Sequence, residues 1–345
     1  MVSQNSNQDR FDSRSDPSGA IHPRATAHVA RQLSLLRGRA VAALAMLVFA
    51  PALLGACGSD RSVAAAKTPA HGDFAGQIDI GDGRELYLRC AGLGSPTVIL
   101  ESGIHDSSDP WNESAVQSSP AVLSGVSRFT RVCEYDRPGT IRYSEPPTLT
   151  ARSTPVSKRR TLPNMVRDLH ALLTAAGVPG PYVLVGHSFG GMIVRLFAQT
   201  YASECAGLVL VDAFGTNIKP LFGDEWPAYE AILNHPGTEL DNEPGFETID
   251  IDGAIQAIEE GAALPMIPLA VISKTEPFAT APVVPESIRA RLEEVWPEVQ
   301  NLLVELEPNT PHFFATGSDH YVQIRDPALT IRAIELVFNR ARPER

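Results

Sequence analysis

The chain has 345 residues, and 43% of them are hydrophobic, which is enough for one large core or two small ones. Its net charge is −11 at pH 7, and an acidic surface repels phosphate backbones, so this composition disfavours nucleic-acid binding. The four cysteines have no CxxC spacing and no accompanying histidine cluster, which disfavours a zinc site, and we expect no metal.

The N-terminal segment is typical of an export signal. A polar stretch ending in two arginines is followed at 40–56 by 17 residues without a charge, interrupted by Pro51. A membrane-spanning helix needs about 20 apolar residues, so this run is too short for one. The run closes with Leu-Gly-Ala before Cys57, which resembles the bacterial lipobox, in which the cysteine is acylated. We therefore expect a lipoprotein signal peptide at 1–56, with a cleaved soluble form or an uncleaved anchor as alternatives.

After Cys57, residues 57–72 lack periodicity and are rich in small and polar residues, so they predict a tether. A lipid anchor at Cys57 would hold the protein on the outer face of the cytoplasmic membrane or elsewhere in the cell envelope. Beyond the tether, we expect one domain at 73–345.

Short apolar runs alternate with helical patterns along this domain. The runs predict strands at 77–80, 85–90, 97–100, 131–135, 182–185, 208–211, 269–272 and 313–315. Apolar residues at helical spacing follow at 162–173 and 192–197. Such alternation predicts an α/β fold with a mostly parallel sheet covered on both faces, and the initial hairpin makes the first strands antiparallel.

The alternation fails once, between about residues 213 and 264. This segment is acidic and rich in Gly and Pro, with helix-compatible pieces at 225–233 and 251–260. Because fifty residues between two core strands are seldom pure loop, we expect a cap inserted over the carboxyl edge of the sheet.

The strongest local motif surrounds Ser188. The apolar strand 182–185 (YVLV) runs into 186–191 (GHSFGG), and a helical pattern begins at Met192. A G-x-S-x-G sequence between a strand and a helix predicts a sharp turn that exposes a nucleophilic serine. The alternative is an ordinary serine at a glycine-rich helix start.

A serine hydroxyl needs a base to take its proton, and in such folds the base follows the last strand. Three histidines follow Ser188 in the chain, namely His235, His312 and His320. The first falls in the expected cap and the second precedes the last strand, so only His320 has the required position.

The domain resembles the α/β-hydrolase superfamily over nearly its whole length. The matching segments are 99–103 (ILESG), 131–139 (RVCEYDRPG), 185–191 (VGHSFGG), 208–213 (LVLVDA) and 319–321 (DHY). The chain departs from the pattern at Asp319, where a glycine is common, and in the turn after Gly139, which lacks a second glycine. The resemblance implies an eight-stranded sheet with helices on both faces, and a Ser-His-acid triad.

The resemblance also implies an oxyanion hole and an acid. One oxyanion donor is the N–H of Phe189, and the other is the N–H of Ile104, after the glycine at position 103. For the acid, Asp212 ends the sixth core strand and Glu276 follows the seventh. The comparison favours Asp212, with Glu276 as the alternative.

The superfamily's strand order makes the second strand a neighbour of the fourth. Cys90 ends the second strand and Cys133 lies in the fourth, so we expect a disulfide between them in an oxidising compartment, with Cys205 left reduced.

Together these features predict a serine hydrolase that needs no cofactor and cleaves a small-molecule carboxylic ester, an amide or a lactone. A cofactor-free haloperoxidase or a C–C hydrolase would use the same triad. A non-catalytic binding lipoprotein of this fold is the third alternative.

Overall fold

The computed structural model describes residues 72–280 and 283–342. The predicted signal peptide, Cys57 and the tether up to residue 71 lie outside the described residues. Within the described ranges, no helix is both long and apolar enough to cross a membrane.

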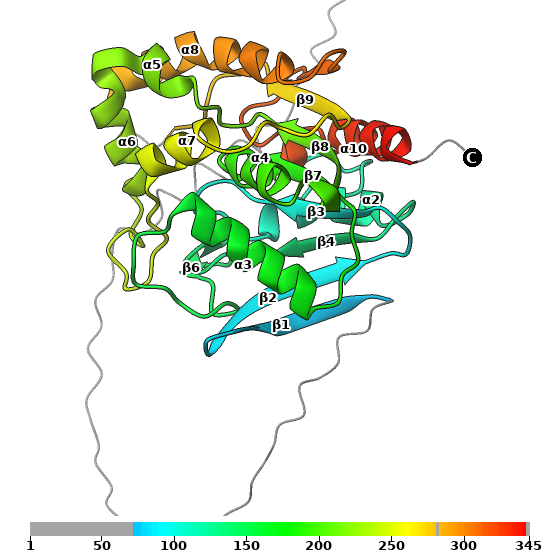
Figure 1. Cartoon of the computed structure of the whole chain (residues 1–345). Helices are drawn as coiled ribbons and strands as arrows, with labels where there is room; N and C mark the ends of the chain where they lie inside the picture. The colour runs from blue at the N-terminus through cyan, green and yellow to red at the C-terminus, as the bar shows by residue number, and fades with distance from the viewer. Residues whose placement is uncertain (1–71, 281–282, 343–345) are drawn as a thin grey trace, which may run out of the picture. The chain divides into compact units, whose positions relative to one another are not determined.

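Eight strands form one sheet in the order β1-β2-β4-β3-β7-β8-β9-β10 (Figure 1). The bounds are β1 Phe74–Gly81, β2 Arg84–Ala91, β3 Thr97–Glu101, β4 Val132–Tyr135, β7 Tyr182–His187, β8 Cys205–Val211, β9 Leu269–Lys274 and β10 His312–Ala315. β2 pairs antiparallel with β1 and β4, and all other neighbours are parallel. The predicted α/β-hydrolase sheet is confirmed.

Alternate side chains of the central strands enter two separate cores, one on each face of the sheet. In β7, Leu184 belongs to the first core, whereas Val183 and Val185 belong to the second. Because β3 and β7 are buried on both faces, their sequences are continuous apolar runs rather than alternating ones.

Helices cover both faces. Their bounds are α2 Val122–Val126, α3 Leu162–Ala175, α4 Gly190–Thr200, α5 Ile218–Phe222, α6 Trp226–Asn234, α7 Ile251–Glu259, α8 Glu286–Val304, α9 Val322–Arg325 and α10 Pro327–Ala341. Short 3₁₀ turns lie at Asp109–Asn112, Ala202–Glu204 and Gly223–Glu225, and a small ribbon pairs β5 (Ile141–Arg142) with β6 (Thr148–Leu149). Residues of α3 and α4 fill the first core, and residues of α2 and α10 fill the second. In Figure 1, α3 and α4 cross in front of the sheet.

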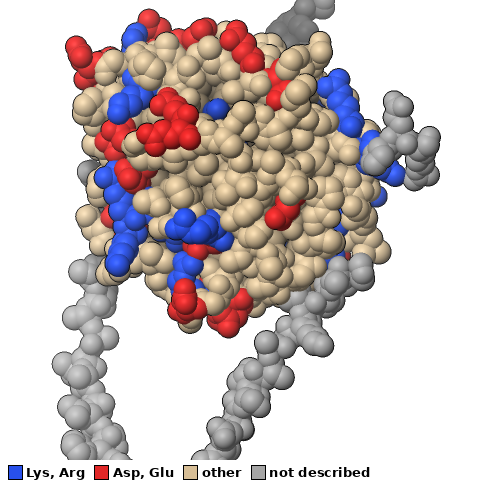
Figure 2. Space-filling model, in the orientation of Figure 1, with Lys and Arg blue, Asp and Glu red and all other residues tan. Residues whose placement is uncertain are grey.

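Three helices, α5, α6 and α7, lie between β8 and β9, where the sequence predicts an inserted cap at 213–264. The helices α6 and α7 begin and end within one residue of the predicted pieces at 225–233 and 251–260. On the face shown in Figure 2, Lys and Arg side chains lie among Asp and Glu side chains near these helices and form no separate basic surface.

A disulfide joins Cys90 of β2 to Cys133 of β4. The two residues are direct partners in the antiparallel ladder, with Cα atoms 4.1 Å apart. Cys205 is a free, buried thiol, and burial raises its pKa to about 12. The structure therefore contains the predicted disulfide, which links the neighbouring strands β2 and β4.

Candidate active site

Ser188 lies on a sharp turn between β7 and α4, as the motif predicts. Its φ is 51°, a conformation that non-glycine residues seldom adopt and that is often found at functional sites. A Cβ on Gly186 would lie 2.6 Å from the Gly190 carbonyl oxygen, and one on Gly190 would lie 2.6 Å from the Ser102 carbonyl oxygen. Both glycines are therefore required by close backbone contacts in this turn.

Asp212 and His320 form a hydrogen-bonded pair at the carboxyl ends of the strands. Asp212 directly follows β8, and its Oδ2 lies 2.6 Å from His320 Nδ1. Asp212 Oδ1 accepts hydrogen bonds from the Trp296 indole at 2.9 Å and the Lys274 backbone N–H at 3.0 Å. The carboxylate is fully buried, and its three donors fix both of its oxygens.

Glu276, the alternative acid, is exposed on the loop after β9. Its backbone N–H donates to the Ser318 carbonyl oxygen at 2.9 Å, but among the described residues its side chain makes no hydrogen bond to His320. The structure thus brings Asp212, and not Glu276, to the predicted base.

His320 is tied to the serine turn through the neighbouring residue, His187. The His187 Nε2 lies 2.9 Å from the His320 carbonyl oxygen, and because a carbonyl only accepts, Nε2 carries the proton. Burial lowers the pKa of His187 well below its ordinary value, so this ring is neutral. In the described part of the chain, the Ser188 hydroxyl makes no hydrogen bond to His320; such contacts often tighten only when substrate binds.

The two predicted oxyanion donors flank Ser188 from different loops. Among the described residues, neither the Phe189 N–H nor the Ile104 N–H donates a hydrogen bond to the protein. Gly103 abuts Ser188, because a Cβ on this glycine would lie 3.1 Å from the serine Cβ. A side chain at position 103 would therefore push the Ile104 loop away from the nucleophile.

A buried charge cluster holds this loop after β3 in place. Arg137 donates to the carbonyl oxygens of Ser102 at 2.9 Å and Gly103 at 2.5 Å, and it forms ion pairs with Glu101 and Glu247. Burial tends to raise the pKa of Glu247, but the charge and hydrogen bonds of Arg137 outweigh it and lower this pKa. Burial raises the pKa of Glu101 to about 7.

Glu247 extends this cluster into the cap. Its Oε2 accepts a hydrogen bond from the His105 backbone N–H at 2.8 Å, one residue beyond Ile104, the predicted oxyanion donor. Neither Glu247 nor the indole of Trp296 was found from the sequence, because their partners lie far away along the chain.

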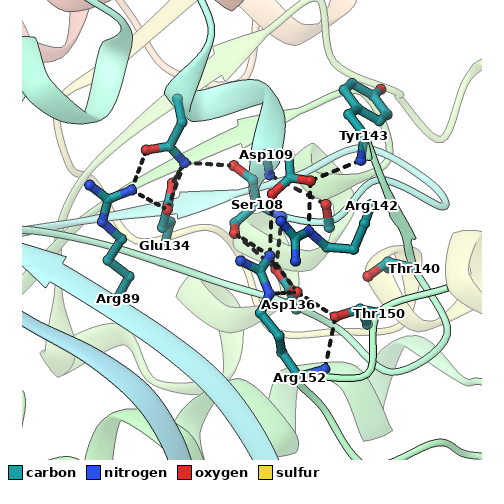
Figure 3. Close-up of polar contacts among 12 residues, drawn as sticks. Arg89, Ser108, Asp109, Glu134, Asp136, Thr140, Arg142, Tyr143, Thr150 and Arg152 are labelled. Atoms are coloured by element: carbon teal, nitrogen blue, oxygen red, sulfur yellow. Dashed lines mark hydrogen bonds and ion pairs between the residues drawn. The ribbon is translucent and has the colours of Figure 1, made fainter. Parts of the chain in front are cut away.

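The far end of the loop after β3 is held by a second polar network (Figure 3). Asp136 accepts hydrogen bonds from the Ser108 backbone N–H at 3.0 Å, the Thr150 hydroxyl at 2.6 Å and the Arg152 guanidinium at 2.7 Å. Arg142 donates to Asp109 at 2.7 Å. The loop is therefore anchored on both sides of Ile104, the predicted oxyanion donor.

A surface hollow on the cap is lined by residues of α5, α6 and α7, including Lys219, Trp226 and Asp252. None of the predicted catalytic residues borders it. The hollow is therefore separate from the predicted catalytic residues.

Comparisons with known proteins agree with this architecture. The model of the alpha/beta hydrolase fold family matches residues 96–240, which include the serine turn and Asp212. A probable transporter, efuK, of Hormonema carpetanum is 30% identical over 143 residues, covering 40% of this chain and 18% of that protein. The uncharacterized protein YqjL of Bacillus subtilis is 28% identical over 121 residues, covering 35% and 41%. The chain thus spans less than half the length of the curated relatives it matches.

Two solved structures share the fold. A probable hydrolytic enzyme from Pseudomonas aeruginosa PAO1 is 16% identical with a TM-score of 0.52, covering 77% of this chain and 94% of its own. An E-2-(acetamidomethylene)succinate hydrolase is also 16% identical, with a TM-score of 0.50 and coverage of 77% and 99%. The family-model match over residues 96–240 and the sheet topology together show that the chain has the α/β-hydrolase fold.

Proposed function

We propose that this protein is a serine hydrolase that cleaves a carboxylic ester by acyl transfer to water, with amides and lactones as related substrates. The observation that carries the proposal is the Asp212–His320 hydrogen bond beside a serine held at positive φ. A carboxylate on Nδ1 fixes the imidazole tautomer that leaves Nε2 free to act as a base.

In the proposed first step, Ser188 Oγ attacks the carbonyl carbon while its proton passes to His320 Nε2. The carbonyl oxygen becomes an oxyanion, and the free N–H groups of Phe189 and Ile104 are suited to receive it. Each such donor typically accelerates acyl transfer by about 10²–10³-fold.

When the tetrahedral intermediate collapses, His320 gives its proton to the leaving alcohol and an acyl-enzyme remains on Ser188. Water then attacks the acyl carbon, His320 takes its proton, and collapse releases the acid and restores the serine. Buried Asp212 would stabilise the imidazolium formed in both halves. None of these steps requires a metal or an organic cofactor.

The test is the Ser188→Ala variant, assayed across p-nitrophenyl esters of increasing chain length. We expect its turnover to fall by about 10⁴–10⁶-fold with an unchanged circular dichroism spectrum, because the nucleophile is removed without altering the core. Activity within tenfold of the wild type would overturn the proposal.

We also propose that the protein is an exported lipoprotein anchored through Cys57. A disulfide between Cys90 and Cys133 supports this, because such bonds persist in oxidising compartments. The Cys57→Ala variant should lose metabolic labelling by a palmitate analogue, since no acyl acceptor remains. Persistent labelling of that variant would contradict the anchor assignment.

A further inference from the structure

Asp106 is a buried carboxyl that the proposed reaction does not use. It lies two residues beyond Ile104 in the loop after β3 and is 6% exposed. Among the described residues, no basic side chain forms an ion pair with it. Burial raises its pKa to about 6, so the carboxyl is mostly ionised at neutral pH. The charges of Arg137 and His320 act against this rise in pKa, but neither side chain contacts the carboxyl in a direct ion pair. A buried, ionised carboxylate without a directly contacting cation is costly inside a protein and is often a functional group.

The two oxygens of Asp106 differ. Oδ1 accepts hydrogen bonds from the hydroxyls of Tyr143 at 2.7 Å and Tyr321 at 3.4 Å. Burial raises the pKa of both phenols, so each keeps its proton and acts as a donor. Oδ2 accepts no hydrogen bond from any described residue, so half of the carboxylate is left without a partner.

This free oxygen lies beside the nucleophile. Asp106 Oδ2 and the Cβ of Ser188 each lie 3.1 Å from the position that a Cβ on Gly103 would take. The buried Nδ1 of His187 lies 3.0 Å from the same position and also has no hydrogen-bond partner in the part of the chain that the structure describes. Since Nε2 of His187 carries the proton, Nδ1 is an acceptor. Two unsatisfied acceptors therefore converge next to Ser188.

The surrounding loops hold Asp106 in this position. The Ile141 N–H donates to the His105 carbonyl oxygen at 2.6 Å, and the Ser107 N–H donates to the Ile141 carbonyl oxygen at 3.1 Å. Figure 3 shows the backbone of Tyr143 held by Asp109, with a hydrogen bond of 2.9 Å. An asparagine could accept the same two tyrosine hydrogen bonds without the cost of burying a charge. The charge of Asp106 is therefore not needed to hold the tyrosines.

We propose that Asp106 recognises a protonated amine of the substrate, so that the enzyme hydrolyses esters or amides carrying an ammonium group near the scissile carbonyl. This inference rests on the proposed serine-hydrolase function. An ammonium group supplies a positive charge in direct contact with the carboxylate, and it supplies the N–H donors that its free oxygen can accept from. A substrate with an anionic group at this place would be repelled by the same carboxylate.

The test compares matched esters that differ only in the amine. On the acyl side, ethyl esters of alanine, β-alanine and γ-aminobutyrate are paired with ethyl propionate and butyrate. On the alcohol side, 2-(dimethylamino)ethyl acetate is paired with the isosteric 3-methylbutyl acetate. For each pair, kcat/KM of the amine-bearing ester is divided by kcat/KM of its amine-free counterpart. This ratio is measured in the wild type and in Asp106→Asn, and comparing the two enzymes cancels the intrinsic reactivity of the esters.

We expect the ratio to fall by about ten- to hundredfold in Asp106→Asn for at least one pair, as for a hydrogen bond to a charged group. Glu243→Gln removes an exposed carboxylate from the segment between β8 and β9 and should leave every ratio unchanged. Ratios that agree within twofold between wild type and Asp106→Asn for every pair would overturn the inference.

A binding measurement separates this inference from the proposed reaction. In Ser188→Ala protein, n-butylammonium should raise the Tm more than butanol at the same concentration, and adding Asp106→Asn should abolish the difference. Equal shifts for the two ligands would overturn the role of Asp106 even if the esters are hydrolysed. Equal ester hydrolysis by wild type and Ser188→Ala would instead overturn the serine mechanism.

Discussion

The loop after β8 and the loop after β3 each place one buried carboxyl beside Ser188, but they satisfy it differently. After β8, Asp212 receives hydrogen bonds from His320, Trp296 and the Lys274 backbone, so both of its oxygens have donors. After β3, Asp106 accepts hydrogen bonds from two tyrosine hydroxyls on one oxygen, and no other described residue donates to its second oxygen.

This difference shows how a protein can use one chemical group in two ways. A carboxylate whose two oxygens both accept hydrogen bonds from the protein is held in one orientation, and it can orient the imidazole that it contacts. A carboxylate with one free oxygen remains available to a ligand. The donors around a carboxyl therefore say more about its role than its burial does, since both residues are almost fully buried.

The largest expected effect comes from neutralising Asp212, the carboxylate whose two oxygens both accept hydrogen bonds from the protein. Asp212→Asn should lower kcat by about 10⁴-fold, because an amide at this position favours the wrong tautomer of His320. Glu276→Gln is the matched control and should cost little, since its side chain is exposed. The reverse ranking in steady-state kinetics would transfer the role of the acid to Glu276.

The next largest effect concerns the contribution to stability of the disulfide between β2 and β4. The disulfide closes a sequence separation of 43 residues, and replacing both Cys90 and Cys133 by alanine should lower the free energy of unfolding by about 4 kcal/mol. Denaturant titration measures this loss. Activity at low temperature should persist, because Asp212 and His320 follow β8 and β10, which do not neighbour β2 or β4 in the sheet. Equal stability of variant and wild type would show that the bridge adds nothing.

A smaller effect should follow from loosening the loop after β3. Glu247→Gln weakens the ion pair with Arg137 that holds the carbonyls next to Ile104. We expect kcat to fall by about ten- to a hundredfold with little change in KM, since a displaced oxyanion donor acts on the transition state. Glu243→Gln, at an exposed position of the same cap segment, is the control. A change in KM with kcat unchanged would indicate instead that Glu247 contributes to substrate binding in the ground state.

Much of the fold could be predicted because the core strands have a recognisable local sequence pattern. β3 and β7 are buried on both faces, so their sequences are unbroken apolar runs. Ser188 follows from the glycines that its turn requires, and His320 follows from its position after the last strand. These signals depend only on residues near each other in the chain.

The remaining parts of the site depend on contacts between distant residues. The sequence left Asp212 and Glu276 open, because both follow the carboxyl ends of core strands and only the tertiary structure brings one of them to His320. Glu247 was missed because it lies 110 residues from its partner Arg137 in a cap without a periodic pattern. No local sequence pattern predicts that Asp106 contacts Tyr321, which lies 215 residues away in the chain.

The most direct test of the central claim is covalent labelling with a fluorophosphonate probe, followed by peptide mass spectrometry. A fluorophosphonate reacts with a serine that has been activated by a neighbouring base. We predict stoichiometric modification of Ser188 in the wild type and much slower modification in Asp212→Asn. Hydrolysis of esters by a wild-type protein whose Ser188 stays unmodified, or is modified no faster than the other serines, would contradict the account.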